Sequence, residues 1–283
     1  MRVSVGQGLC ISALQCFLRG ENMLGAIIGD IVGSIYEPKD HRIKTKDFPF
    51  FSEDCRFTDD SVCTTAVADT LLHDLLPAET MRKWGKRYPR CGFSQIFKDW
   101  IYSDRDAPNC TFRNGAAMRV SPAAFLNREN LDAALVAADK VTVISHDHPE
   151  GLKGARATTH AIWLAYQSED VATVREVIAT EYGYDLTRTV DDIRPDYVFD
   201  MTCQGTVPQA VTCALESESY EDAVRNAISL GGESDTLGSI AGASAEALHG
   251  IPAEIKEQAK GRYLVNAPDI RDIMTEMYRT VGN

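Results

Sequence analysis

Apolar positions recur at helical spacing along most of the chain. In residues 61–72 the recurring positions are Val62, Cys63, Ala66, Val67, Thr70 and Leu71, which share one face of a helix. Residues 237–249 are small and apolar nearly all round, which is typical of a fully buried helix. Similar patterns predict helices at residues 80–88, 94–102, 116–126, 131–144, 154–166, 171–181, 208–215 and 220–230, although 141–144 also fits a strand. The chain is therefore predicted to be all-α.

The segments between these helices predict where the loops lie. Residues 38–56 carry charge, Pro and Phe without a helical period, and residues 184–195 are an acidic loop. Residues 104–115 are rich in turn-forming residues and lead into the next helix. From Pro252 onward the pattern is that of an amphipathic helix. Because no repeat or linker divides the sequence, we expect a single compact multi-helix domain with its loops gathered at one end.

Two acidic clusters open helices in this pattern. The first is TDDS at residues 58–61, where Thr58 or Asp59 can cap the helix that follows. Its adjacent carboxylates, Asp59 and Asp60, repel one another, and a hard divalent cation with oxygen ligands would remove that repulsion. An acidic helix start that binds nothing is the alternative interpretation of this cluster alone.

The second cluster is GGESDT at residues 231–236, immediately before the buried helix 237–249. Its two glycines permit a tight turn. The helix that follows would hold Glu233 and Asp235 near the core, where carboxylates are rarely left uncompensated. Two oxygen-rich helix starts that face each other would form a site for two metal ions at the loop-rich helix N-termini.

Together these clusters resemble the paired metal signature of the ADP-ribosylglycohydrolase family, a group of ADP-ribosyl-acceptor hydrolases. Residues 25–37, 114–119 and 145–151 also resemble that family and follow in its order. One position departs from the family pattern, because Glu233 stands where Asp is usual and its side chain is one methylene longer.

The resemblance implies hydrolysis of the bond between C1 of ADP-ribose and its acceptor. It implies two Mg²⁺ or Mn²⁺ ions, which would fix the ribose and lower the pKa of a bound water. The implied general base is Asp60 or Glu37, and the sequence does not choose between them. The implied metal ligands are Thr58, Asp59, Asp60, Glu233, Asp235 and Thr236.

The resemblance also assigns substrate-binding residues. The loop with Arg113, Asn114 and Gly115 would cradle the diphosphate, and Phe112 would stack on adenine. Arg113 stands where glycine is common in the family, so it adds a cation for phosphate or restricts the loop. His146 would be a polar contact to the ligand, and its alternative role is a structural histidine that caps the next helix.

Two features leave their roles open. Asp30 lies inside an apolar helix, where a core polar group satisfied by hydrogen bonds and a functional residue are equally compatible with the sequence. Residues 1–22 fit the rest poorly, because their mildly apolar stretch is too short to span a bilayer and is a poor signal peptide. We interpret residues 1–22 as an N-terminal extension of a domain at 23–283, or as sequence upstream of a true start at Met23.

Composition limits the classes of binding partner that the sequence predicts. A net charge of −12 argues against a nucleic acid surface. Eight cysteines without a C-x-x-C pair indicate reduced thiols in a cytoplasmic protein. The expected substrate is an ADP-ribosylated protein or small molecule, with no membrane partner and a monomeric chain. The alternatives are a catalytically impaired ADP-ribose-binding or structural homologue, and a two-metal nucleotide phosphohydrolase.

Overall fold

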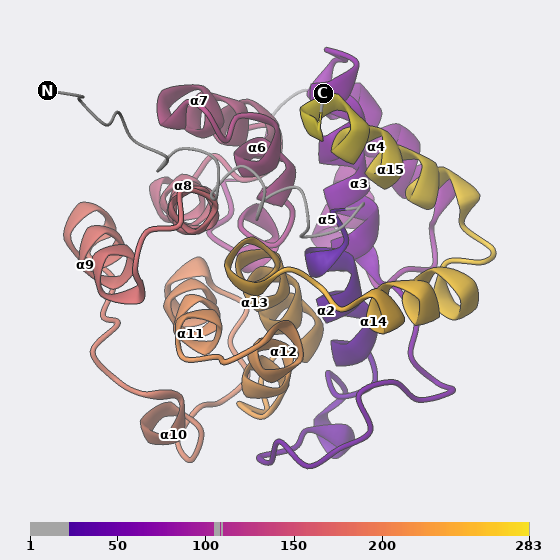
Figure 1. The fold of residues 1–283 in the computed structure, drawn as a ribbon. Coiled ribbons are helices and arrows are strands. Elements are labelled where there is room, and N and C mark those ends of the chain that lie inside the picture. The colour runs from indigo at the N-terminus through magenta and orange to yellow at the C-terminus, as the bar shows by residue number, and fades with distance from the viewer. Residues whose placement is uncertain (1–22, 105–107, 109, 283) are drawn as a thin grey trace, which may run out of the picture.

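The computed structural model describes residues 23–104, 108 and 110–282, and in these residues helices joined by loops form the structure, without a strand or sheet (Figure 1). An isolated antiparallel bridge joins Arg113 to Thr202, and the all-α prediction is confirmed. The α-helices are α2 (Gly25–Gly33), α3 (Asp59–Leu72), α4 (Pro77–Arg87), α5 (Gln95–Tyr102), α6 (Ser121–Leu126), α7 (Leu131–Thr142), α8 (Pro149–Tyr166), α9 (Val171–Tyr182), α10 (Val190–Ile193), α11 (Cys203–Leu215), α12 (Tyr220–Ile228), α13 (Ser234–His249), α14 (Ala253–Gln258) and α15 (Pro268–Gly282). Two 3₁₀ turns, η1 (Lys39–His41) and η2 (Asn114–Ala116), and a π-helical turn, η3 (Ala259–Tyr263), complete the elements.

Helix α13 lies at the centre of the molecule, between α2 on one side and α11 and α12 on the other (Figure 1). It also packs against α8 and α3. Because its side chains are small and almost all buried, neighbours can approach it from every direction. The buried helix predicted from residues 237–249 is therefore the hub of the fold.

Helix α2 touches α13 along a line of close backbone contacts, here called the glycine seam, where Gly29 and Gly33 of α2 lie against Gly238 and Ser234 of α13. A Cβ atom added at Gly29 would lie 1.9 Å from the carbonyl oxygen of Gly238, and one added at Gly33 would lie 2.3 Å from that of Ser234. Neither distance leaves room for a side chain, so the two backbones are in direct contact. This contact places Asp30 of α2 beside the N-terminus of α13.

The segment after α2 is a loop, as predicted, apart from the short turn η1. Lys44 Nζ donates to the carbonyls of Arg194 at 2.7 Å and Leu230 at 2.6 Å. Arg225 of α12 donates to the carbonyls of Lys46 at 2.9 Å and Phe48 at 2.7 Å. Long basic side chains thus tie this loop to the second half of the chain.

Several details differ from the sequence-based prediction, and α8 and α11 each begin five residues earlier than expected. The acidic loop 184–195 contains one helical turn, α10, which the capping box between Thr189 and Asp192 stabilises. The helix expected from residue 116 begins only at Ser121, because residues 114–116 form η2. The C-terminal amphipathic pattern is divided into α14, η3 and α15.

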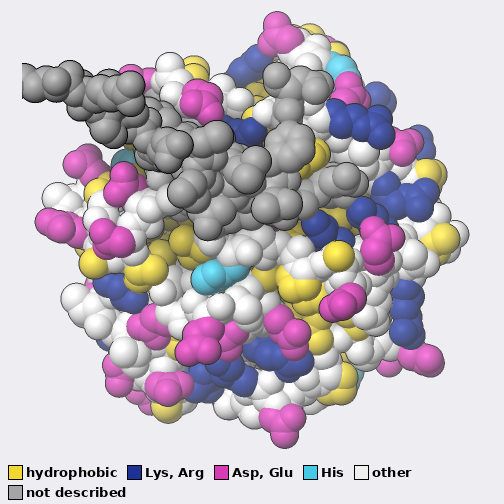
Figure 2. Space-filling model, viewed as in Figure 1, with side chains coloured by type: hydrophobic (Ala, Val, Ile, Leu, Met, Phe, Trp, Pro, Cys, Tyr) yellow, Lys and Arg dark blue, Asp and Glu magenta, His cyan; other side chains and the backbone are white. Residues whose placement is uncertain are grey.

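The surface carries both signs of charge. On the face drawn in Figure 2, Lys and Arg side chains lie among Asp and Glu side chains rather than forming one continuous field. Within the described part of the chain, no helix is long and apolar enough to cross a membrane. The predictions for residues 1–22 lie outside the described residues.

Candidate metal centre and ligand cavity

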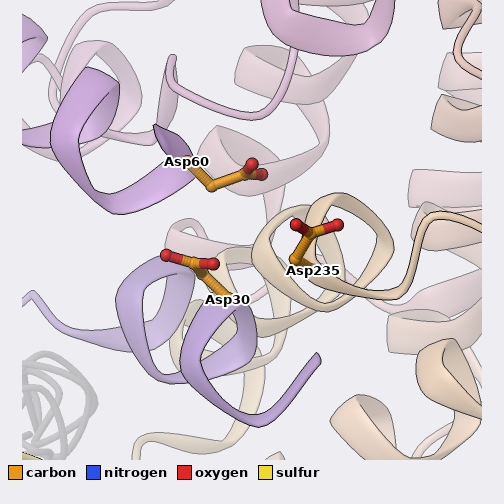
Figure 3. A group of neighbouring side chains, drawn as sticks. All are labelled: Asp30, Asp60 and Asp235. Atoms are coloured by element: carbon orange, nitrogen blue, oxygen red, sulfur yellow. The ribbon is translucent and has the colours of Figure 1, made fainter. Parts of the chain in front are cut away.

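Three buried carboxylates from three helices face one another: Asp30 of α2, Asp60 of α3 and Asp235 of α13 (Figure 3). Each offers an oxygen, and these oxygens all lie within 4.8 Å of one another. Thr236 Oγ1 also lies 3.5 Å from Asp60 Oδ2. The two acidic helix starts singled out in the sequence, 176 residues apart at this contact, thus meet in the fold.

Asp30 accepts more hydrogen bonds than the other two carboxylates of the trio. It accepts from the backbone N–H of Thr58 at 2.8 Å and of Ser61 at 3.1 Å. It also accepts from the hydroxyl of Thr58 at 2.6 Å and from that of Ser61. Burial raises the pKa of Asp30 to about 6, and these four bonds oppose the rise. Asp30 therefore fixes the first turn of α3 against α2 and also belongs to the carboxylate trio.

Asp60 is in the opposite situation. Its Oδ1 is buried, and within residues 23–104, 108 and 110–282 it has no hydrogen-bond partner. Burial and the charges of Asp235, Asp30 and neighbouring acids raise the pKa of Asp60 well above its usual range. Burial and nearby acids likewise raise the pKa of Asp235 strongly and that of Asp59 to about 8.

These observations fit a hard divalent cation. A buried carboxylate oxygen without a donor costs free energy that a metal ion would recover, and crowded carboxylates repel until a positive charge lies between them. The hydroxyls of Thr58 and Thr236 donate to Asp30 and Asp60. Thr58 Oγ1 also accepts from the backbone N–H of Asp60 at 3.4 Å, which leaves one of its two lone pairs for a cation. Oxygen donors of this kind suit Mg²⁺ or Mn²⁺ better than zinc.

Glu233, the position that departs from the family pattern, reaches away from the trio. Its Oε2 accepts a hydrogen bond of 2.6 Å from Asn114 Nδ2, which also donates to Thr206 Oγ1 at 3.0 Å. Burial raises the pKa of Glu233 to about 7, although the bond from Asn114 opposes the rise. The longer side chain therefore links the start of α13 to η2.

A cavity of about 330 Å³ lies over these carboxylates. Its acidic part contains Glu37, Asp59, Asp60, Glu233 and Asp235, together with Thr58 and Thr236. Burial raises the pKa of Glu37, opposed by the charges of Arg42 and Arg56. The remaining lining is basic, aromatic or backbone in character: Arg56, Arg90, Arg113, Asn114, Gly115, Arg119, His146 and Phe199, with Cys63, Cys91, Gly92, Ser94, Phe97, Met118 and Met201 between them.

Phe112 and Phe199 differ in their position relative to the cavity. Phe112 is 43% exposed, and its ring packs edge-on against His148 with 5.2 Å between centroids, outside the cavity lining. Phe199 does line the cavity, and the Arg42 guanidinium covers its ring at 4.1 Å. No motif surrounds Phe199, so the sequence did not predict its position, although a large aromatic residue in a polar loop was a signal.

The two histidines of the H-x-H pair, His146 and His148, lie in different surroundings. His148 is the N-cap of α8, where its Nδ1 accepts from the backbone N–H of Glu150 at 3.1 Å. His146 is 5% exposed and lines the cavity. The helix-capping role considered for His146 therefore belongs to His148.

Comparison with known proteins is consistent with this geometry. The family model described as ADP-ribosylglycohydrolase matches residues 21–281. A solved structure titled ADP-ribosylglycohydrolase-related protein complex has a TM-score of 0.69 at 20% sequence identity. That match covers 93% of this chain and 97% of the other, and at this identity it shows a shared fold. A search of curated proteins found no match.

Proposed function

Because the chain belongs to the ADP-ribosylglycohydrolase family, we propose that it is a metal-dependent hydrolase that releases ADP-ribose from an ADP-ribosylated acceptor by cleaving the bond at ribose C1. One observation carries the proposal: both uncompensated carboxylates and arginine side chains line a single cavity. A ligand with ribose hydroxyls and a diphosphate matches both kinds of group.

We assign two Mg²⁺ or Mn²⁺ ions to Thr58, Asp59, Asp60, Asp235 and Thr236, with Glu233 at the edge of the set. When bound, such ions supply positive charge and Lewis acidity for the ribose and a water molecule. The crowded carboxylates support this assignment, because the charges acting on Asp60 and Asp235 are those of other acids.

The general base is one of two carboxylates, Glu37 or Asp60. Glu37 fits the role better, because it lines the cavity without belonging to the carboxylate trio. Its raised pKa makes it a stronger base than an exposed glutamate. Cleavage at C1 passes through an oxocarbenium-like state, and the nearby carboxylate charge favours positive charge on the ribose.

The diphosphate end of the substrate is assigned to Arg113, Asn114 and Gly115. Arg113 contributes a cation at the cavity lining, together with Arg56 and Arg90. His146 provides a polar contact. An aromatic wall for the base is available at Phe199 inside the cavity, with Phe112 farther out.

The test is incubation with ADP-ribosylated arginine and serine peptides in Mg²⁺ or Mn²⁺, followed by EDTA, with products separated chromatographically. Intact ADP-ribose whose release stops in EDTA supports the proposal. Phosphate or AMP would indicate a nucleotide phosphohydrolase instead. ADP-ribose binding without any product would indicate a catalytically impaired homologue. A monomer by sizing would agree with the expected oligomeric state.

A single substitution tests the proposed metal centre separately from the rest of the cavity. Asp235→Ala should abolish release of ADP-ribose and also the thermal stabilisation by Mg²⁺ or Mn²⁺, while circular dichroism still reports the helical fold. Undiminished turnover in this variant would contradict the proposed site.

A further inference from the structure

One of the residues that line the cavity carries a fully buried guanidinium. Arg119 has 0% exposure, and its Nη2 donates to the carbonyl of Val141 at 3.2 Å and to Ser145 Oγ at 2.7 Å. Its Cζ lies 5.9 Å from the centre of the Phe97 ring, which in turn lies 6.4 Å from the His146 ring. Arg119 is therefore held from several sides next to His146.

Of the two polar groups next to His146 Nδ1, Ser145 can supply a proton to it and Arg119 can accept none from it. Ser145 Oγ lies 2.9 Å from Nδ1, and Arg119 Nη2 lies 3.4 Å from it. A guanidinium only donates hydrogen bonds. The Ser145 hydroxyl accepts from Arg119, so its own proton is available for Nδ1. The hydrogen-bond network thus assigns Nδ1 as an acceptor.

If Nδ1 accepts, the neutral imidazole carries its proton on Nε2. His146 Nε2 lies close to Gly115, because a Cβ atom added at Gly115 would lie 3.1 Å from this nitrogen. Gly115 and His146 both line the cavity. A glycine at residue 115 therefore leaves the Nε2–H bond room to meet a ligand.

We propose that Arg119 and Ser145 are positioning residues that fix His146 as the Nε2–H tautomer, so that the cavity has an uncharged hydrogen-bond donor for a ligand oxygen. The ligand oxygen belongs to ADP-ribose, so this part of the inference rests on the proposed function. The tautomer itself is a property of the free protein.

The charges around His146 support a neutral ring. Burial and the positive charges of Arg119 and Arg113 lower the pKa of His146 well below its usual range. An imidazole that stays neutral while Nδ1 is occupied is a donor and a poor proton shuttle. The proton-accepting group for hydrolysis is then left to the carboxylates.

The tautomer can be measured directly by ¹⁵N NMR of the histidine rings without substrate. The six histidines are distinguished by the signal that disappears in His146→Gln. We expect His146 to show a protonated Nε2 and an unprotonated Nδ1 between about pH 5.5 and 8, around the ordinary histidine pKa. A protonated Nδ1, or an imidazolium that titrates at the ordinary pKa, would overturn the proposal.

Two variants test the positioning residues. Ser145→Ala should give mixed tautomers. Arg119→Met should raise the pKa of His146, because it removes one of the two positive charges that lower it, while burial, the larger cause, remains. Thr142→Val is the matched control, because Thr142 is another buried residue of the same region whose hydroxyl has no partner among the described residues. It should leave the His146 signals unchanged. If Arg119→Met does not fold, the spectra of the wild type and of Ser145→Ala still test whether His146 is held as the Nε2–H tautomer.

Kinetics then connect the tautomer to the ligand. In Ser145→Ala, we expect KM for the ADP-ribosyl peptide to rise about tenfold with kcat nearly constant, the effect of a weakened hydrogen bond to substrate. An unchanged KM despite mixed tautomers would contradict the ligand contact. If the wild-type protein shows the predicted tautomer but hydrolyses none of the ADP-ribosyl peptides, the proposed function is refuted and the tautomer assignment still holds.

Discussion

The two ends of helix α3 each hold a buried carboxylate, and their surroundings differ. At the C-terminal end, Asp69 accepts from Trp84 Nε1 at 2.8 Å and pairs with His73 Nδ1 at 2.9 Å. At the N-terminal end, Asp60 meets other carboxylates and has one oxygen without a partner in the described part of the chain. Both residues are at least 94% buried, so burial alone does not separate them.

The comparison shows how a structural carboxylate differs from a candidate ligand. Asp69 and Asp30 are surrounded by N–H and O–H donors, which satisfy their charge within the protein. Asp60 and Asp235 are surrounded by charges of the same sign. Repulsion of this kind in a folded core supports the proposed cation, which would relieve it. Substitution of one carboxylate at a time tests this distinction.

The largest expected effect is that of Asp60→Asn. Loss of a metal-binding carboxylate should lower kcat/KM for ADP-ribose release by roughly a thousandfold, which corresponds to several kcal/mol of transition-state stabilisation. In EDTA the same variant should melt at a higher temperature than the wild type. The folded pKa of Asp60 is raised, so its ionisation destabilises the fold increasingly as the pH rises above its unfolded value of about 4.

Asp69→Asn is the matched control on the same helix. It should retain activity and melt at a lower temperature, because its amide group can satisfy only one of the two donors. Equal melting shifts for Asp60→Asn and Asp69→Asn in EDTA would remove the distinction between the two ends of α3.

Asp30→Asn should destabilise the protein by about 3 kcal/mol with or without metal. An amide oxygen cannot accept all four bonds that the Asp30 carboxylate receives, and bonds to a charged group contribute about 1.5–3 kcal/mol each. Chemical denaturation in EDTA measures this loss. If the denaturation midpoint of Asp30→Asn equals that of the wild type, Asp30 is not the structural member of the trio.

A smaller effect is expected for Glu233→Asp. The shorter side chain should lose the 2.6 Å bond to Asn114 and release η2 from α13. We expect activity to fall about tenfold, the size of one charge-assisted hydrogen bond. Comparison of kcat/KM with that of Asn114→Ala tests the link. A rise in activity would show instead that the glutamate is a poor substitute for the usual aspartate.

The smallest effect is a pH-dependent one at the C-terminal end of α3. Bonds to Asp69 and Glu276 raise the pKa of His73 above its usual value. The resulting stabilisation is fully present below about pH 6.5 and is lost as the pH rises through the folded pKa. His73→Gln should therefore lose stability mainly at low pH, by less than about 1 kcal/mol because the side chain is 39% exposed. Denaturant melts at pH 5.5 and 8.5 should show a larger difference at the lower pH.

The sequence predicted the helical class and the two acidic helix starts because both depend on local patterns. Small residues mark α13 as buried, and carboxylates next to hydroxyls mark the starts of α3 and α13. The role of Asp30 remained open because its donors come from residues 58–61, which only the fold brings to it. The network of Arg119 with residues 141–146 and the position of Phe199 were not predictable for the same reason.

The glycine seam has a consequence for ion selectivity. The main chains of α2 and α13 touch, so the gap between Asp30 and Asp235 is a property of the scaffold and not of side-chain choice. Two walls of the binding space are thus rigid, while α3 carries the third. Discrimination between cations of different radius would then depend on how far the first turn of α3 can yield against its four hydrogen bonds to Asp30, and engineering a larger or smaller ion site should begin there.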